Sequence, residues 1–251
     1  ILDEKEVKMN YTIGVGVLNI ALALLLSPFL EGIVRKIRAL IHSRKGPPLR
    51  QPYYDLLKLL GKENLEASPN YLLRWAPVIY LATILIAGLL VPMGTVKPPL
   101  GGAGDVIVFV YFTTLAAVVM MMAAAASESP YAQIGASREM MMLLTVEPVM
   151  AIALITGAIN ARSLRMADIV MWYLAHGPTV SMVIAGASVF LAVQAQLGKL
   201  PFDIPEAEQE IMGGLFIETS GPKYALFKWG FLAKQIIFAS LLCQIFVPWP
   251  T

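Results

Sequence analysis

The stretch Val106-Ile-Val-Phe-Val-Tyr-Phe-Thr-Thr-Leu-Ala-Ala-Val-Val-Met-Met-Met-Ala-Ala-Ala-Ala126 contains no charged residue. An apolar run of about 20 residues is long enough to cross the hydrocarbon core of a bilayer as a helix. Five other stretches are also predominantly apolar: Tyr11 to Leu30, Leu72 to Pro92, Met140 to Asn160, Val180 to Leu197 and Tyr224 to Val247. The sequence therefore predicts an all-α fold, a polytopic transmembrane helix bundle with about six spans.

The composition of the chain agrees with residence in a lipid bilayer. Of its 251 residues 57% are hydrophobic and 14% are charged, whereas soluble domains carry roughly 25% charge. The net charge of +2 is too small to indicate a nucleic-acid partner. One cysteine, Cys243, and two histidines, His42 and His176, cannot assemble a zinc, haem or iron–sulfur site. We expect a single transmembrane domain over residues 1–251, with any redox centre held by a partner subunit.

Basic residues predict how the chain is oriented in the cell membrane. The connection between the first two spans, about residues 31–71, holds eight of them: Arg35, Lys36, Arg38, Arg44, Lys45, Arg50, Lys58 and Lys62. The next loop holds Lys97 alone. Because short cytoplasmic loops are enriched in Lys and Arg, we expect the first connection inside and the N-terminus outside, although Arg162 and Arg165 in an outer loop oppose this assignment.

Within this inner connection, Gln51 to Lys62 has the pattern of one amphipathic helix. Tyr53, Leu56, Leu57 and Leu60 recur at helical spacing. Such a helix lies along a membrane surface, and both a plain lipid anchor and a docking site for partner subunits fit the pattern.

Glu147 is the sharpest single candidate for ion chemistry, because it lies about two turns inside the fourth span. Pro148 follows it and removes a backbone donor from the helix. A carboxylic acid at this depth serves either as a proton or ion relay or as a neutral hydrogen-bonding group between helices.

Other charged residues extend this set. Arg138 and Glu139 open the fourth span and form either the mouth of a charged track toward Glu147 or an interfacial salt bridge. Glu128 adds an acid on the same side of the membrane. Lys234 lies deep enough in the sixth span to seek a carboxylate partner.

An acidic inner connection, about residues 198–223, joins the fifth and sixth spans. It holds five carboxylates: Asp203, Glu206, Glu208, Glu210 and Glu218. Pro201 and Pro205 favour an extended entry, and Glu206 to Ile211 is typical of a short helix. Glu206 and Glu210 would then share one helical face and a proton, although a solvated acidic loop also fits.

Three ordered motifs resemble those of a known family. They are Arg44-Lys45-Gly46-Pro47-Pro48 with Gln51-Pro52-Tyr53-Tyr54-Asp55-Leu56-Leu57-Lys58-Leu59-Leu60; Ser129-Pro130-Tyr131-Ala132-Gln133-Ile134-Gly135-Ala136-Ser137-Arg138 leading to Glu147; and Pro201-Phe202-Asp203-Ile204-Pro205-Glu206-Ala207-Glu208-Gln209-Glu210 with Ser220-Gly221-Pro222. The chain resembles the membrane subunit that respiratory complex I shares with membrane-bound [NiFe] hydrogenases.

The resemblance implies about eight tilted helices, so that two more are expected after Thr251. It also implies an inner face that meets a peripheral redox arm through Arg44, Lys45, Gln51, Tyr53, Tyr54 and Asp55. The acids of the family start a charged axis toward antiporter-like membrane subunits. The positions that match its motifs are Arg138, Glu147, Asp203, Glu206, Glu208 and Glu210.

Departures from the complex I pattern favour the hydrogenase branch and count against a quinone site. Arg44 to Pro48 runs almost directly into Gln51, and Lys228-Trp229-Gly230 stands where complex I has an acidic motif. The resemblance thus implies a membrane anchor and ion-coupling subunit of an energy-converting hydrogenase. Ferredoxin would be the electron donor, and the NiFe centre and iron–sulfur clusters would lie in large and small peripheral subunits. A complex I quinone-chamber subunit, a paralogue in a sulfur-reducing complex and a self-contained ion transporter are the alternatives.

Overall fold

The computed structural model describes residues 2–65, 70–93, 98–101 and 105–247. Lys97, the one basic residue expected in its loop, and the chain end after Val247 lie outside the described residues. The described part folds into the helices α1 (Leu2–Ile41), α2 (Gln51–Leu60), α3 (Tyr71–Leu90), α4 (Val106–Ala125), α5 (Pro130–Ala161), α6 (Met166–His176), α7 (Val180–Gln196), α8 (Glu208–Ile211) and α9 (Gly221–Phe246), with a 3₁₀ turn η1 (Gly214–Phe216).

All six predicted spans are helices. In the described part of the chain, five helices are long and apolar enough to cross a membrane: α1 from Gly14 onward, α3, α4, α5 and α9. The helix α7 is also apolar but has 17 residues. The prediction of an all-α, multi-pass membrane bundle is therefore confirmed.

Small side chains let these helices approach one another closely. On α4, Ala116, Ala117, Ala123 and Ala124 are buried, and α4 packs between α3 and α5. Small residues at helix interfaces favour such packing because no side chain holds the backbones apart. Large side chains, among them Phe109 and Phe238 in an edge-on contact, fill the space that remains.

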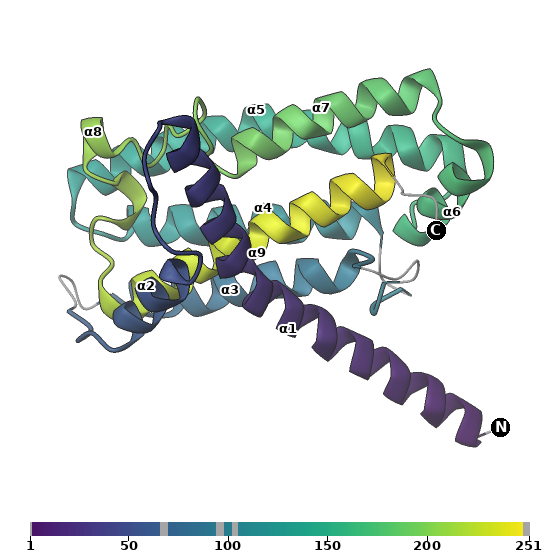
Figure 1. The fold of residues 1–251 in the computed structure, drawn as a ribbon, viewed down its shortest axis with the longest axis horizontal. Helices are drawn as coiled ribbons and strands as arrows, with labels where there is room; N and C mark the ends of the chain where they lie inside the picture. The colour runs from purple at the N-terminus through teal and green to yellow at the C-terminus, as the bar shows by residue number, and fades with distance from the viewer. Residues whose placement is uncertain (1, 66–69, 94–97, 102–104, 248–251) are drawn as a thin grey trace.

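The helix α1 crosses this bundle obliquely (Figure 1). Pro28 lies inside α1 and lacks the N–H that would bond to the carbonyl of Leu24. The indole Nε1 of Trp229 donates to this Leu24 oxygen at 2.9 Å, and Ser27 Oγ donates to it at 3.3 Å. The hydroxyl of Tyr53 donates to the next carbonyl oxygen, that of Leu25. The bonds from Trp229 and Tyr53 attach α1 to its neighbours α9 and α2.

The three connections expected inside lie together at one end of the molecule. Figure 1 shows α2 and α8 at this end, and α6 and the N-terminus at the other. Ser220 Oγ bonds the backbone of Leu65, accepting from its N–H at 3.1 Å and donating to its carbonyl at 2.9 Å. Asn70 donates to the carbonyl of Ala126 at 3.2 Å. We call this region the loop end.

Two boundaries differ from the sequence-based expectations. The helix α1 continues to Ile41, so Arg35, Lys36 and Arg38 lie on a helix rather than in a connection. The helix α5 begins at Pro130, because proline is well accommodated in a first helical turn. Arg138 and Glu139 therefore lie about two turns inside α5 instead of opening it.

The amphipathic helix was correctly predicted as α2, although its faces differ in detail. Pro52 and Leu56 are buried, whereas Leu57, which was expected on the apolar face, is 64% exposed. A further helix, α6, occupies the connection after Arg162 and Arg165.

Candidate functional site

The acidic connection folds onto the start of α5. A Cβ atom on Gly135 would lie 2.8 Å from the backbone nitrogen of Leu215, so this approach of α5 and η1 requires glycine. Arg138 donates from Nη1 to Glu210 Oε2 at 2.7 Å and to the carbonyl of Ile204 at 3.3 Å. Arg138 thus holds the connection at two points, and it pairs with Glu210 across the chain rather than with its neighbour Glu139.

The prediction that Glu206 and Glu210 share a helical face was wrong. The helix α8 begins only at Glu208, because Ala207 before it has a non-helical backbone. Glu206 therefore lies outside the helix, where Pro205 has already turned the chain. Glu210 points to Arg138, whereas Glu206 lines a cavity.

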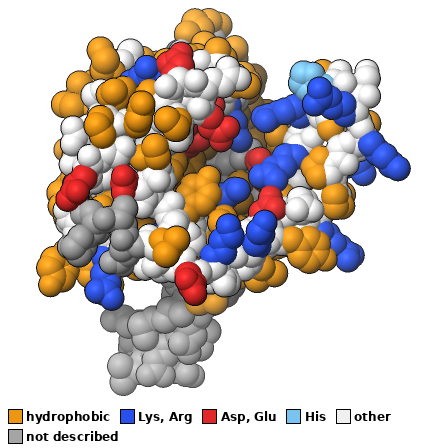
Figure 2. Space-filling view, turned by 90° about the vertical axis from the view of Figure 1, so that its left-hand side faces the viewer, with side chains coloured by type: hydrophobic (Ala, Val, Ile, Leu, Met, Phe, Trp, Pro, Cys, Tyr) orange, Lys and Arg blue, Asp and Glu red, His pale blue; other side chains and the backbone are white. Residues whose placement is uncertain are grey.

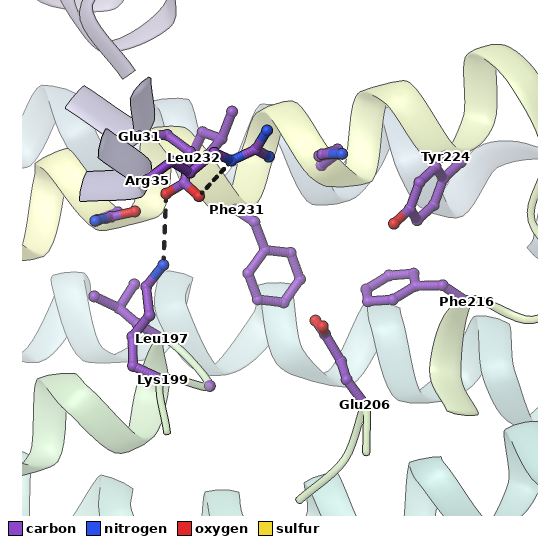
Figure 3. A pocket seen from close by; sticks show the side chains of 12 residues that line it. Glu31, Arg35, Leu197, Lys199, Glu206, Phe216, Tyr224, Phe231 and Leu232 are labelled. Atoms are coloured by element: carbon purple, nitrogen blue, oxygen red, sulfur yellow. Dashed lines mark hydrogen bonds and ion pairs between the residues drawn. The ribbon is translucent and has the colours of Figure 1, made fainter. Parts of the chain in front are cut away.

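This cavity, which we call the loop-end cavity, has a volume of about 190 Å³. It is enclosed by α1, the acidic connection, η1 and α9. In Figure 3 the carboxyl group of Glu206 projects between the rings of Phe216 and Phe231. Tyr224 and Lys228 line the wall that α9 contributes.

A network of charged groups borders the cavity. Arg35 contacts Glu31 Oε1 at 3.2 Å and Asp55 Oδ2 at 2.9 Å. Gln51 donates to the other oxygen of Asp55 at 3.1 Å. Lys199 Nζ lies 3.6 Å from Glu31 Oε2. The network therefore joins α1, α2 and the acidic connection.

Asp55 is ionised in this network. Burial acts to raise the pKa of Asp55, but the hydrogen bonds from Arg35 and Gln51 outweigh burial and hold this pKa below its usual value. Gln51 and Asp55 were expected to face a partner subunit, and here both are engaged within the chain.

The acids of the connection behave in the opposite way. Burial, together with the charges of Asp203, Glu139 and Glu208, raises the pKa of Glu206 to about 7, although Lys199 opposes this rise. Burial and the charge of Glu208 also raise the pKa of Asp203. This raised pKa places the ionisation of Glu206 near neutral pH.

A second, smaller cavity leads from Glu206 into the bundle. Its volume is about 20 Å³, and its lining includes Asp203, Glu206, Glu139 and Gln196. This space is sufficient for about one water molecule. One oxygen of Asp203 is buried without a hydrogen-bond partner among the described residues. A water molecule in this cavity would donate the missing hydrogen bond.

Lys234 lies beyond this small cavity and is 2% exposed. It was expected to contact a carboxylate, but its ammonium group donates to the backbone and side-chain oxygens of Gln196 at 2.9 and 3.1 Å. The charges of Glu139 and Glu147 act on Lys234 from greater distances. Lys234 therefore connects the two acids electrostatically without pairing directly with either.

Glu147 lies between α4 and α5, where Thr114 donates a hydrogen bond to it. Both residues line a groove of about 340 Å³ that also includes Tyr111 and Ile155. Glu206, Glu139, Lys234 and Glu147 thus form a series of charged groups from the loop end into the spans, which we call the charged series.

The remaining candidates lie apart from this series. Glu128 and Glu208 are exposed, and Glu218 follows η1 in a partly buried position. Arg44, Lys45 and Tyr54 are exposed at the loop end. Figure 2 faces this end and shows most of the Lys and Arg side chains on its right-hand half, with acidic side chains both among them and over the other half.

Three site residues were not predicted from the sequence: Glu31, Lys199 and Gln196. Glu31 precedes Arg35 by four residues, a spacing that pairs opposite charges on one helical face and is visible in the sequence. Lys199 and Gln196 had no such signal, because their partners lie far away in the chain.

The fold and the charged series define a polytopic membrane subunit with ionisable groups in its interior. A family model described as NADH dehydrogenase matches residues 13–251, and the chain belongs to this family. The resemblance inferred from the motifs is therefore confirmed.

Among the relatives are components of several oxidoreductase complexes. Formate hydrogenlyase subunit 4 of Escherichia coli (strain K12) is 33% identical over 89% of this chain and 74% of its own length. Hydrogenase-4 component C of the same organism is 33% identical over 95% of this chain and 76% of its own length. An NADH-quinone oxidoreductase subunit of Geobacter sulfurreducens is 29% identical over 89% of this chain and 73% of its own length.

A solved structure has the same fold. It is a chain of the membrane-bound sulfane sulfur reductase, described as an archaeal respiratory membrane complex. The two superpose with a TM-score of 0.85 at 27% identity, over 94% of this chain and 78% of the other. The protein is accordingly a membrane subunit of the oxidoreductase type, related to subunits of hydrogenases and of complex I.

Proposed function

We propose that this chain is the membrane anchor and ion-coupling subunit of an energy-converting membrane-bound [NiFe] hydrogenase complex. In this role it links ferredoxin-driven proton reduction in the peripheral arm to proton or sodium translocation. Large and small hydrogenase-like subunits dock on the loop end, and antiporter-like subunits adjoin the spans. The NiFe centre and the iron–sulfur clusters belong to the peripheral subunits.

The observation that carries this proposal is the charged series. Buried ionisable groups are costly in a membrane protein and mark pathways for ions and protons. In this chain Lys234 is buried and the three acids are partly buried, and the set runs from Glu206, in a connection at the loop end, to Glu147 between two spans. A charge change in a docked redox subunit would therefore act first on Glu206 and then on groups within the bundle.

The hydrogenase assignment is supported by two relatives that are 33% identical to this chain and carry hydrogenase or hydrogenlyase names. The NADH-quinone oxidoreductase subunit from Geobacter sulfurreducens is 29% identical, and the sulfur reductase chain is 27% identical.

Glu206→Gln and Glu147→Gln test the coupling role. Each variant is introduced into the intact complex, which is then reconstituted into vesicles. We expect hydrogen evolution with a soluble reduced dye to stay near the wild-type rate, because the redox chemistry lies outside this chain. Ion translocation per hydrogen formed should fall by at least roughly tenfold, since one lost interaction of about 1.4 kcal/mol has this effect.

Glu63→Gln is the matched control, because Glu63 is an exposed acid of the first connection, outside the charged series. It should leave both rates unchanged. Wild-type translocation in both Glu206→Gln and Glu147→Gln would refute the coupling role.

A sulfur-reducing complex is the second candidate, and the structural match to the sulfane sulfur reductase favours it. Purification of the native complex decides between the two. Nickel in the purified complex, together with hydrogen evolution, supports the hydrogenase, whereas reduction of polysulfide by a nickel-free complex supports the alternative. Turnover that depends on added quinone would instead indicate a complex I type of subunit.

A further inference from the structure

Lys199 is a loosely held cation of the loop-end cavity. Its contact with Glu31 Oε2 measures 3.6 Å, which is longer than a charge-assisted hydrogen bond of about 2.7–2.9 Å. Glu31 Oε2 is buried and receives no hydrogen bond from any described residue. The other oxygen of Glu31 is already bound by Arg35 at 3.2 Å.

The other cations around the cavity have different surroundings. Arg35 contacts two carboxylates, Glu31 and Asp55. Lys228 lies over the ring of Tyr224, 5.8 Å from its centre. Lys199 is the cation with a single, long contact to a carboxylate, which a second carboxylate can replace.

Lys199 also acts on the acids across the cavity. Its charge counteracts the rise in the pKa of both Asp203 and Glu206. Figure 3 shows Lys199 and Glu206 on the same side of the cavity, with Glu31 opposite. Gly198 directly precedes Lys199, and nothing lies within 4 Å of the position that a Cβ would take there. Neighbouring side chains therefore do not pack against this part of the backbone.

We propose that Lys199 exchanges between Glu31 and Glu206 according to the protonation state of Glu206. When Glu206 is neutral, Lys199 stays on Glu31, as in this structure. When Glu206 loses its proton, the new negative charge attracts the ammonium group across the cavity. Lys199 thereby sets the pH at which the proposed coupling element ionises, an inference that rests on the coupling function proposed above.

The groups that face Glu206 from each packed element are consistent with this role. The helix α5 contributes Glu139, the acidic connection Asp203 and Glu208, α9 Tyr224 and Lys228, and α1 Arg35. The three carboxylates all raise the pKa of Glu206, because each repels a negative charge there. A mobile cation that arrives with ionisation offsets this repulsion.

Two substitutions should shift the titration of Glu206 in opposite directions. Lys199→Met removes the cation, so Glu206 should retain its proton to higher pH. Glu31→Gln weakens the alternative partner, so Lys199 should reside on Glu206 and lower the pH at which it ionises. We expect shifts of roughly half a pH unit or more, the size of a partly buried charge pair.

The titration is measured on the purified complex by infrared difference spectroscopy of the protonated carboxyl band, with Glu206→Gln to assign this band. The pH profile of ion translocation in vesicles is the second readout. Lys199→Arg keeps the charge and should shift the titration less than Lys199→Met. Lys36→Met removes an exposed charge of α1 and should leave the titration unchanged.

The double variant Lys199→Met with Glu31→Gln isolates the exchange. If Lys199 carries the effect of Glu31, the downward shift of Glu31→Gln should disappear in the Lys199→Met background. Persistence of this shift, or equal titrations in wild type and both single variants, would overturn the exchange. Because the infrared band reports the protonation of Glu206 directly, this result is separate from a failure of Glu206→Gln to uncouple, which would instead overturn the proposed function.

Discussion

The ammonium group of Lys234 in α9 binds the last residue of α7, Gln196, through both its backbone carbonyl at 2.9 Å and its side-chain oxygen at 3.1 Å. The last carbonyls of a helix have no partner within the helix, and the helix dipole favours a cation at this end. The C-terminus of α7 therefore stabilises a lysine that is 2% exposed. This contact places a positive charge between Glu139 and Glu147 without neutralising either of them.

Lys234→Met should separate assembly from coupling. Methionine has a similar volume, and the desolvation cost that the buried charge no longer incurs offsets the loss of its two bonds to Gln196. We expect the complex to assemble in normal yield, while ion translocation per turnover falls by roughly tenfold or more. Size-exclusion chromatography measures assembly, and a dye trapped in vesicles measures translocation. Normal translocation would show that the role of Glu139 and Glu147 in coupling does not depend on the charge of Lys234.

Arg138 bonds both Glu210 and Ile204, so substitutions of Arg138 and of Glu210 should loosen the acidic connection to different extents. Glu210→Gln removes one contact, whereas Arg138→Gln also releases the carbonyl of Ile204. Because the Glu210 side chain is 65% exposed, the ion pair itself contributes only about 0.2–1 kcal/mol. Limited proteolysis should therefore cut the acidic connection faster in Arg138→Gln than in Glu210→Gln. Equal rates would mean that the bond to Ile204 does not hold the connection.

The helices and the identity of the charged residues could be predicted from the sequence because both depend on local patterns. Apolar runs predicted six helices, of which five are long enough to span a membrane, and apolar residues at helical spacing predicted α2. Glu147 and Lys234 stood out because a charge inside an apolar run is rare. These features require no knowledge of the tertiary contacts.

The partners of these residues could not be predicted, because they come from distant parts of the chain. Glu206 and Glu210 look equivalent at helical spacing, but the backbone at Ala207 separates them into a partly buried and an exposed acid. Lys234 was expected to pair with an acid, yet the free end of α7 supplies its partner. Glu31 and Lys199 acquire their significance only where α1 and the acidic connection meet.

The protonation of Glu206 predicts how stability changes with pH. Its pKa rises from 4.5 to about 7 on folding, so the folded protein binds the proton more tightly than the unfolded chain. The resulting stability is fully present below about pH 4.5 and is lost as the pH rises through about 7. We expect the thermal unfolding temperature of the complex to fall across this range, and Glu206→Gln to remove part of this dependence. An identical pH profile in the variant would contradict a buried, titrating Glu206.

The contact between Gly230 and Tyr80 predicts a packing defect unrelated to charge. A Cβ atom on Gly230 would lie 2.6 Å from Cε1 and 2.9 Å from Cδ1 of Tyr80. The Tyr80 ring is 0% exposed and packs against Phe227 and Phe231 at centroid distances of 5.4 and 5.8 Å, so it has little room to move. Gly230→Ala should therefore destabilise the bundle by about 1–3 kcal/mol, the usual cost of overpacking.

Thermal unfolding of the purified complex measures this effect, with Gly14→Ala as the control, because no atom lies within 4 Å of a Cβ there. Both variants add one methyl group to a membrane-spanning helix, so they differ only in the space available. The double variant Gly230→Ala with Tyr80→Leu should recover part of the loss, since the smaller side chain vacates the contact. If Gly230→Ala unfolds at the same temperature as Gly14→Ala, the α3 and α9 helices adjust without strain, and the close approach at Gly230 does not determine their packing.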